Sequence, residues 1–269
     1  MNTSIEVKDL TKSFNGRTVV DKISFRVDKG EVFGLLGHNG TGKSTIIDLL
    51  LGLKKPDDGI GTIFGLEPSA NRKAVFERVG VQLQSSNYQN NIRVDELCKE
   101  MSALYEKPED YHKLLKYFSL EKLEKSQVNK LSGGERQRLS VALALINNPE
   151  IVFLDELTTG LDTAARREVW GHLKDLKQNG TTIFLTTHYM EEAENLCDRI
   201  FLIKDGRKVT EGTVKDVIES KGGKVAGSVS SKTDYLINND VTSTSGKNKK
   251  AKELGIPIIS EEMFLEMMK

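Results

Sequence analysis

A glycine-rich segment that follows an apolar run constrains this chain more than any other feature. Residues 37–45 read GHNGTGKST and fit the pattern G-x-x-x-x-G-K-[ST]. They follow the apolar run Val32–Leu36 and open a helical pattern that we expect over residues 44–53. A strand, a glycine loop and a helix N-terminus in this order point backbone N–H groups and a partial positive charge at phosphate oxygens. The segment therefore predicts a phosphate-binding loop.

The side chains of this loop supply the rest of the phosphate chemistry. We expect Lys43 to reach the β- and γ-phosphates of a nucleotide, and the Ser44 hydroxyl to coordinate Mg²⁺. The alternative is an ordinary glycine turn with an exposed lysine, and the coincidence of strand, loop and helix argues against it. The residues expected to bind the nucleotide here are Gly37, Asn39, Gly40, Gly42, Lys43, Ser44 and Thr45.

Two carboxylates end a second apolar run. Residues 151–154 are apolar, and Asp155 and Glu156 follow them directly. Buried parallel strands read as continuous apolar runs, and ligands bind at their carboxyl ends. We therefore expect Asp155 in the Mg²⁺ shell, and Glu156 orienting or deprotonating an attacking water. An acidic residue after a strand is a weak signal alone, but it becomes specific beside a phosphate loop.

Short β-branched runs alternate with helical patterns, which indicates an α/β architecture. No strand pattern stands out between residues 85 and 131, so that stretch predicts a mostly helical insertion. We expect strands over residues 5–7, 18–20, 23–27, 31–36, 60–63, 79–81, 151–154, 182–186 and 199–203, and helices over 44–53, 94–105, 110–118, 133–147, 163–178 and 190–196.

Composition excludes several other classes of protein. The 269 residues include 39 Lys and Arg and 39 Asp and Glu, and this balance argues against a nucleic-acid partner. Cys98 and Cys197 match no metal-binding spacing, so we expect free thiols. No apolar stretch approaches the ~20 residues that a membrane-spanning helix needs, and residues 1–10 lack the apolar core of a signal peptide. Any membrane role must then come through a partner.

Four further segments carry a resemblance to a known family. Residues 131–138 read LSGGERQR, residues 158–162 read TTGLD, and residues 186–193 read TTHYMEEA. Gln84 closes the run VGVQLQ at residues 79–84. Together with the phosphate loop and the acidic pair, this order resembles the ATP-binding subunit of an ABC transporter over roughly residues 3–219. The wording of residues 82–84 and 188–194 looks most like subunits that serve multidrug or antibiotic exporters.

The resemblance implies a P-loop ATPase core with an antiparallel β subdomain and a helical subdomain at about residues 85–145. It implies binding and hydrolysis of ATP with Mg²⁺. It also implies two partners, a membrane-spanning permease subunit whose export it energises and a second ATP-binding subunit, most simply a second copy of this chain. Two such subunits would sandwich two ATP molecules head to tail, on the inner face of the cell membrane.

The resemblance also assigns individual residues. Gln84 would bind Mg²⁺ and lead into the segment that senses the membrane partner, and His188 would contact the γ-phosphate. Phe14 would stack on the adenine, although it could equally be a core phenylalanine on a strand. Asp162 would reach across the dimer, or would only cap the helix that follows.

The LSGGE segment would complete the site of the opposing subunit. Ser132, Gly133 and Gly134 would cradle the γ-phosphate of ATP that the other subunit holds. The alternative is a plain helix N-cap, with Ser132 and Glu135 forming a capping box, and both can hold at once. One departure from the family is Leu157, where a proline usually follows the catalytic glutamate. Leucine frees the backbone dihedral φ, so we expect a less rigid loop.

The tail differs from the usual end of this family. Residues 222–237 and 250–262 resemble the BRCT domain at the end of bacterial NAD-dependent DNA ligases, so we divide the chain into residues 1–219 and a small α/β segment at 220–269. The first BRCT strand is either missing or replaced by residues 207–210. Lys247 matches the phosphate-holding lysine of phosphopeptide-binding BRCT domains. The alternative function is therefore a soluble ABC-type ATPase that acts with DNA or a repair complex through this tail.

Overall fold

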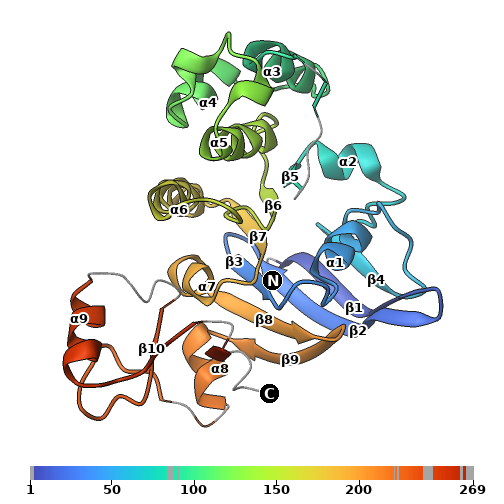
Figure 1. The fold of residues 1–269 in the computed structure, drawn as a ribbon. Coiled ribbons are helices and arrows are strands. Elements are labelled where there is room, and N and C mark those ends of the chain that lie inside the picture. Colours follow the sequence, from blue (N-terminus) through green and yellow to red (C-terminus); the bar gives the residue numbers. More distant parts are fainter. Residues whose placement is uncertain are drawn as a thin grey trace.

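The structure is a computed structural model that describes residues 3–83, 88–89, 91–220, 222, 224–238, 245–260 and 263–264. Within these ranges, no helix is long and apolar enough to cross a membrane. Figure 1 shows a central sheet with helices around it, a helical lobe at one end and a small appended unit at the other.

An antiparallel sheet of three strands forms the N-terminal part. Strands β1 (Thr3–Phe14), β2 (Arg17–Asp28) and β4 (Asp58–Ile63) lie in the order β2-β1-β4. A tight turn joins β1 to β2, and both Asn15 and Gly16 adopt positive φ there. Strand β2 unites two strands that we expected separately, at residues 18–20 and 23–27. The predicted antiparallel subdomain is confirmed.

The central sheet has six strands, in the order β5-β6-β7-β3-β8-β9. They are β5 (Val79–Gln82), β6 (Ile151–Asp155), β7 (Thr182–Thr187), β3 (Val32–Leu36), β8 (Arg199–Lys204) and β9 (Arg207–Gly212). Neighbouring strands from β5 to β8 pair in parallel, and only β9 runs antiparallel, beside β8. Every residue of β3, β6 and β7 is buried, which explains their continuous apolar runs.

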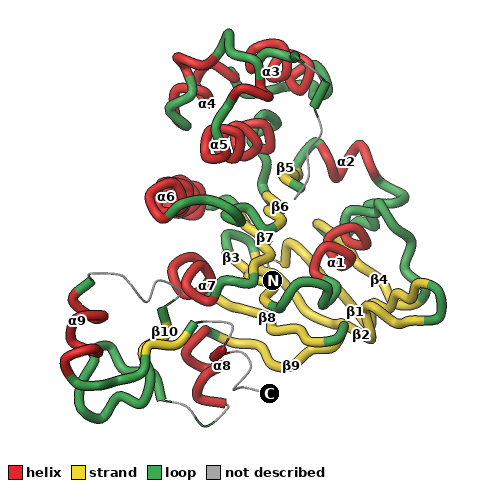
Figure 2. The backbone as a smooth tube through the Cα atoms, in the orientation of Figure 1, coloured by secondary structure: helices red, strands yellow, loops and turns green. Residues whose placement is uncertain are grey.

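Helices pack around this sheet (Figure 2). They are α1 (Lys43–Leu50), α2 (Arg72–Phe76), α6 (Thr163–Gln178), α7 (Met190–Leu196) and α8 (Val214–Ser220). The bounds expected for α6 and α7 are confirmed, whereas α2 was not predicted. Helix α1 stops three residues before the expected end at 53, because the chain turns at Gly52 with a φ of 64° and passes close to Ser69.

Residues 94–144 form the predicted helical lobe. It contains α3 (Val94–Ser102), α4 (Tyr111–Tyr117), α5 (Gly133–Ala144) and the short 3₁₀ helices η1 (Glu121–Leu123) and η2 (Val128–Lys130). Figure 1 places these helices together beyond the β5 edge of the central sheet. Helix α5 ends at Ala144, not at residue 147 as expected, and α3 ends at Ser102, before the expected residue 105.

Two hydrophobic clusters cover the two faces of the sheet. On one face, Phe33, Phe153 and Phe184 pack with ring centroids 5.2–5.6 Å apart, against the antiparallel sheet and α1. On the other face, Val152 and Ile183 pack in a cluster that includes residues of α5 and α6. The alternation of these side chains along each strand thus ties all layers of the ATPase body to one sheet.

The tail forms a small unit of its own. Strands β10 (Leu236–Ile237) and β11 (Ile258–Ile259) pair in parallel, and α9 (Gly246–Glu253) lies between them in sequence. Their core is a small cluster around Ala251 and Ile256. The suggestion that residues 207–210 replace the first BRCT strand is wrong, because β9 pairs with β8 of the central sheet.

Candidate nucleotide site

The ends of three neighbouring strands converge on one site. Strands β6, β7 and β3 are adjacent and parallel, so their carboxyl ends share one edge of the sheet. The acidic pair follows β6, His188 follows β7, and the glycine loop follows β3. The Gly37 N–H donates to the Thr187 carbonyl at 3.3 Å and joins two of these ends.

The glycine loop has the backbone that the motif requires. Gly40 and Gly42 adopt φ values of 80° and 102°, and a Cβ on Gly42 would lie 2.7 Å from the Val19 carbonyl oxygen. Side chains therefore cannot be added at Gly42 without moving β2. Helix α1 starts at Lys43 with no side chain capping it, which leaves its first N–H groups for a ligand.

A cavity of about 350 Å³ opens beside this loop. Its described lining contains Asn39, Gly40, Gly42, Lys43, Ser44 and Thr45 from the predicted loop, together with Glu156 and Val19. Gly37 lies at the base of the loop, where its N–H is bonded to β7. The structure thus brings the loop and the acidic pair together, and it adds Val19, which sequence reasoning missed because nothing marks it as more than a strand residue.

Lys43 lies buried at the centre of the loop. Its ammonium group donates to the carbonyl oxygens of Gly37 at 2.8 Å and His38 at 3.1 Å. It also lies 3.1 Å from Glu156 Oε1, and both side chains are less than a tenth exposed. A lysine held in this way presents its charge at a fixed place, where phosphate oxygens would compete for it.

Asp155 is the last residue of β6 and is buried. The Thr186 hydroxyl of the neighbouring strand donates to its carboxylate. Burial raises the pKa of Asp155, while hydrogen bonds from the hydroxyls of Thr186 and Ser44 act in the opposite direction. The Ser44 hydroxyl and the Asp155 carboxylate therefore form a pair of hard oxygen donors at the mouth of the loop.

Glu156 follows with an unusual backbone. It adopts a φ of 50°, and its N–H is held by both the carbonyl and the hydroxyl oxygen of Thr186, at 3.2 and 3.1 Å. A non-glycine residue at positive φ marks a position that its surroundings must enforce. Sequence reasoning did not assign Thr186, although it directly precedes Thr187 and His188 in the motif at residues 186–193.

His188 faces Glu156 from the end of β7. Its Nδ1 lies 3.8 Å from Glu156 Oε1 and has no hydrogen-bond partner among the described residues. Burial lowers the pKa of His188, and the nearby Glu156 carboxylate raises it again. A histidine whose pKa is held low is a neutral donor or acceptor near pH 7, which suits contact with a phosphate oxygen.

Leu157 is only 3% exposed and packs in the hydrophobic core. The sequence predicted that a leucine in place of proline would loosen this loop. Burial holds this side chain in the core, and the looser loop stays a prediction.

The remaining predicted residues lie outside the cavity. Ser132 caps α5 in a capping box, accepting from the Glu135 N–H at 3.3 Å, and it is exposed together with Gly133. Gly134 is half-buried beside Ala165. Asp162 caps α6 by accepting from the Ala165 N–H at 2.9 Å. Both capping alternatives are confirmed, and a role across a dimer stays a prediction. Gln84 lies outside the described residues.

Phe14 is exposed, and this contradicts the alternative that it is a core residue. Its side chain at the end of β1 is 38% accessible. The ammonium groups of Lys12 and Lys54 lie 5.5 and 5.4 Å from the ring centroid. An accessible ring with cations beside it suits stacking of a base that carries phosphates.

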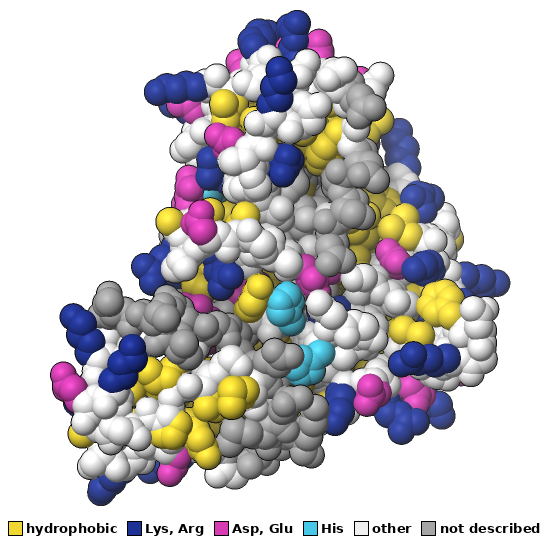
Figure 3. All heavy atoms as spheres, viewed as in Figure 1, with side chains coloured by type: hydrophobic (Ala, Val, Ile, Leu, Met, Phe, Trp, Pro, Cys, Tyr) yellow, Lys and Arg dark blue, Asp and Glu magenta, His cyan; other side chains and the backbone are white. Residues whose placement is uncertain are grey.

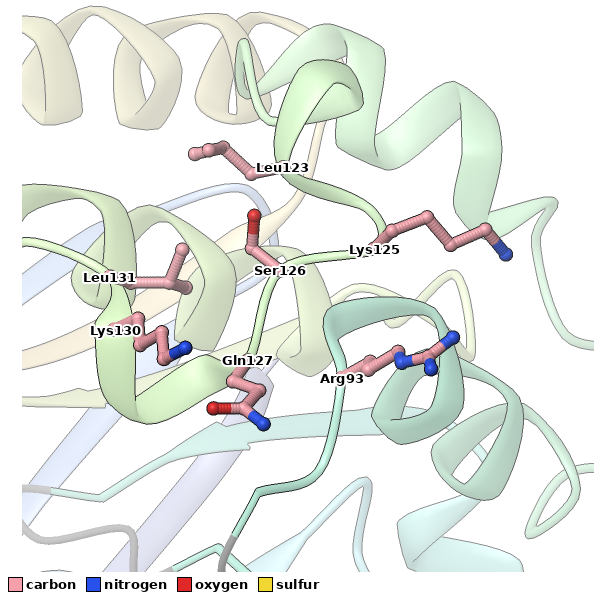
Figure 4. Close-up of a pocket in the computed structure, with 7 residues that line it drawn as sticks. All are labelled: Arg93, Leu123, Lys125, Ser126, Gln127, Lys130 and Leu131. Atoms are coloured by element: carbon pink, nitrogen blue, oxygen red, sulfur yellow. The ribbon is translucent and has the colours of Figure 1, made fainter.

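A second pocket of about 570 Å³ lies in the helical lobe (Figure 4). Arg93, just before α3, lines it together with the stretch between η1 and η2 and the start of the LSGGE segment. The residues lining it are Arg93, Leu123, Lys125, Ser126, Gln127, Lys130 and Leu131, so its charged side chains are all cations. This pocket shares no residue with the cavity at the glycine loop.

Comparison with known proteins decides the family. Residues 20–159 match the family model described as ABC transporter. The chain belongs to the ABC transporter family. It is 41% identical over 222 residues to the Nod factor export ATP-binding protein I of Rhizobium etli, covering 81% of this chain and 70% of that protein. It is 42% identical over 226 residues to the protein of the same name from Paraburkholderia xenovorans, covering 82% and 74%.

Solved structures agree with this assignment. One described as the ATP binding subunit of an ABC transporter superposes with a TM-score of 0.76 at 28% identity, covering 83% of this chain and 95% of that one. A dimeric bacterial ABC transporter cassette superposes with a TM-score of 0.71 at 27% identity, covering 78% and 98%. This chain is therefore an ATP-binding and ATP-hydrolysing subunit, from a family whose cassettes dimerise and work with membrane permeases.

A second family model also matches. Residues 179–268 match the BRCT domain model, which supports the resemblance seen in the tail. The match starts at residue 179, just before β7. It therefore includes β7, β8 and β9 of the ABC ATPase sheet, together with helix α7. Among the described residues, the part beyond α8 contains its own two-stranded sheet, β10 with β11. Lys247 there lines a groove of about 800 Å³ whose other charged residues are Lys215, Glu191, Glu194 and Asp198, and the carboxylates would repel a phosphate.

The exposed ring of Phe14 generates a prediction. Phe14→Ala should raise the Kd for ATP by about tenfold, because stacking on a base contributes ~1–3 kcal/mol. Phe14→Trp should keep the affinity, since it keeps the stacking face. Calorimetric titration with ATP measures both, with Leu104→Ala as a control at another exposed apolar residue. Equal affinity for Phe14→Ala and wild type would show that the ring does not contact the base.

Proposed function

We propose that this chain hydrolyses ATP at the glycine-loop cavity and thereby energises export through a separate membrane-spanning subunit. The observation that carries the proposal is the convergence of Lys43, Glu156 and His188 at the ends of three adjacent strands. Export is favoured because the relatives at 41–42% identity are named as export ATP-binding proteins. The chain would then be peripheral, held at the inner face of the cell membrane by its partner.

The geometry suggests a role for each group. Glu156 accepts a proton from a water, the water oxygen attacks the γ-phosphorus, and the bond from that phosphorus to the bridging oxygen of ADP breaks. Lys43 and the N–H groups at the start of α1 stabilise the charge that develops on the phosphate oxygens. His188 contacts a γ-phosphate oxygen and keeps Glu156 oriented, from its place 3.8 Å away.

The oxygen donors at the loop fit a magnesium ion. Ser44 and Asp155 offer a hydroxyl and a carboxylate, which are hard ligands of the kind Mg²⁺ takes together with phosphates and water. Gln84 would add an amide oxygen. When bound, the ion neutralises charge on the β- and γ-phosphates. Ser44 and Asp155 would also help to orient the nucleotide.

A second copy of the chain would complete each site. Ser132, Gly133 and Gly134 are accessible or half-buried at the N-terminus of α5, and none of them lines the cavity that contains Lys43. A helix N-terminus of this kind can hold a γ-phosphate presented by an opposing subunit. Asp162, exposed at the head of α6, is placed to contact that subunit.

Substitution of the proposed base tests the mechanism. Glu156→Gln should lower turnover by at least about 10²-fold while ATP binding persists, since only the proton acceptor is lost. With ATP and Mg²⁺ present, the variant should elute as a dimer in size-exclusion chromatography, because the bridging γ-phosphate is retained. Glu121→Gln, an exposed carboxyl in the helical lobe, is the control. Full turnover in Glu156→Gln would contradict the assignment.

The pocket of the helical lobe suits the membrane partner. Arg93 lies nine residues after Gln84, and it lines the pocket together with Lys125 and Lys130. Lys125 is paired with Asp95 at 2.8 Å, so Arg93 and Lys130, beside the apolar Leu123 and Leu131, would receive an acidic segment of the membrane-spanning subunit. Such a contact would lie close in sequence to Gln84, the proposed Mg²⁺ ligand. The multidrug or antibiotic subtype remains a prediction, because cargo is chosen in the membrane subunit.

Charge reversal tests this contact. In cells that contain the native partner, the chain should sediment with the membrane fraction. The double variant Arg93→Glu with Lys130→Glu should move to the supernatant, because like charges then face each other, while its ATP turnover in isolation stays unchanged. Lys174→Glu on the exposed side of α6 is the control for a change of surface charge. Sedimentation of the double variant with membranes would contradict the proposed contact.

The proposed domain division places the whole ATPase in residues 1–219 and the BRCT-like segment in 220–269. The cavity-lining residues all precede the boundary, and the tail has its own small core. On the face that Figure 3 shows, basic and acidic side chains are interspersed, so that face presents no continuous basic patch of the kind that DNA binding uses.

Deletion of the tail tests both the division and the alternative function. A chain lacking residues 222–269 should keep ATP turnover and ATP-dependent dimer formation, because none of the proposed site residues is removed. A folded deletion variant without turnover would contradict the division. Binding of duplex DNA at low salt that is lost on this deletion would favour the alternative of an ATPase recruited to DNA.

A further inference from the structure

A buried carboxylate lies behind the catalytic loops and has no role in the chemistry described so far. Glu192 belongs to α7, four residues after His188, and it is only 2% exposed. Carboxylates are almost never buried to this extent unless other groups hold them. Glu192 must therefore be held by specific donors.

Two donors from two different segments, a hydroxyl and an indole N–H, hydrogen-bond to this side chain. Glu192 Oε1 accepts from the Thr158 hydroxyl at 2.9 Å and from the Trp170 indole N–H at 3.1 Å. The Thr187 hydroxyl also acts on this carboxylate, because it is among the groups that lower the pKa of Glu192. Both threonines are 1% exposed, so these bonds are shielded from water.

The two threonines belong to the two loops that carry the proposed chemistry. Thr158 is two residues after Glu156, inside a turn closed by the Thr159 N–H and the Glu156 carbonyl at 3.2 Å. Thr187 directly precedes His188, and its hydroxyl oxygen accepts from the Tyr189 N–H at 2.9 Å. One carboxylate thus joins the loop after β6 to the loop after β7, with α6 holding it through Trp170.

Stability alone does not account for a carboxylate at this place. Burial raises the pKa of Glu192, and the hydrogen bonds from Thr187, Thr158 and Trp170 only partly oppose it. Apolar replacements of buried ionic groups are often neutral or stabilising. What an apolar side chain could not do is accept hydrogen bonds from the Thr158 hydroxyl and the Trp170 indole at once.

We infer that Glu192 is a positioning residue that couples the loop of Glu156 to the loop of His188. Glu192 lies on α7, four residues after His188, and holds Thr158, so it fixes the carboxyl group of Glu156 and the imidazole of His188 relative to each other. It also fixes the start of the segment that leads to Asp162 at the head of α6. The inference rests on the proposed hydrolysis at Glu156, because that function gives the alignment its purpose.

The test compares Glu192→Leu and Glu192→Gln with wild type in the full-length chain. Glu192→Leu should lower kcat by roughly 10- to 100-fold, since small misplacements of reacting groups cost that much. The KM for ATP should stay unchanged, because the glycine loop is untouched. Glu192→Gln should restore most of the rate, as its amide oxygen can still accept from Thr158 and Trp170. Glu194→Gln, exposed on the same helix, is the control.

A spectroscopic readout separates positioning from folding. Trp170 is the single tryptophan of the chain, so its emission reports directly on its bond to Glu192. Emission should change in Glu192→Leu and return towards wild type in Glu192→Gln. If the leucine variant does not fold, Thr158→Val removes one donor and Thr158→Ser retains it, and the valine variant alone should lose kcat.

The outcomes distinguish the two levels of the proposal. An active wild type together with an unchanged kcat in folded Glu192→Leu, or in Thr158→Val, overturns the coupling and leaves the proposed function intact. A rise in KM with no fall in kcat also overturns it, because positioning acts after ATP has bound. A wild type that hydrolyses no ATP overturns the proposed function, and the coupling with it.

Discussion

The parallel pairing of β6, β7 and β3 is the constraint on which the rest of the molecule depends. It aligns the ends of three strands that are distant in sequence, so Asp155, Glu156 and His188 meet the glycine loop. Such strands must be covered on both faces. The phenylalanine cluster and the antiparallel sheet cover one face, and α5 and α6 cover the other. Both subdomains therefore help to hold these strand ends in place.

The charged side chains of the site are buried, so water screens their interactions only weakly. Lys43, Asp155 and Glu156 are all buried, and burial alone would be costly for each of them. The cost is offset because the lysine lies beside the glutamate and the aspartate receives a threonine hydroxyl. The same low dielectric strengthens every contact that a triphosphate would make with Lys43 and the start of α1. Glu192 extends this arrangement one layer further from the cavity.

The sequence predicts what local patterns encode. The glycine loop, the acidic pair, α6 and the helical lobe were expected because each depends on a contiguous motif or a clear period. Thr186 and Glu192 could not be found in this way, since their partners are fixed by strand register and helix packing between distant segments. Phe14 was ambiguous for the same reason: the sequence does not show that it ends strand β1, where its ring is exposed. The ends of α1 and α3 differ because tertiary turns override helical patterns there.

In the tail region, the pairing of strands determines which structural unit each segment belongs to. The BRCT model reaches back to residue 179, where strand and helix patterns alternate as they do in any α/β unit. Hydrogen bonds assign β7, β8 and β9 to the ATPase sheet, which leaves β10 and β11 as a pair. A two-stranded sheet is marginal alone. Phe264 packs against the cluster of Met190 and Val217, so the body contributes to holding the tail in place. The tail therefore contacts the ATPase body through Phe264, while the proposed chemistry of the ATPase uses nothing from the tail.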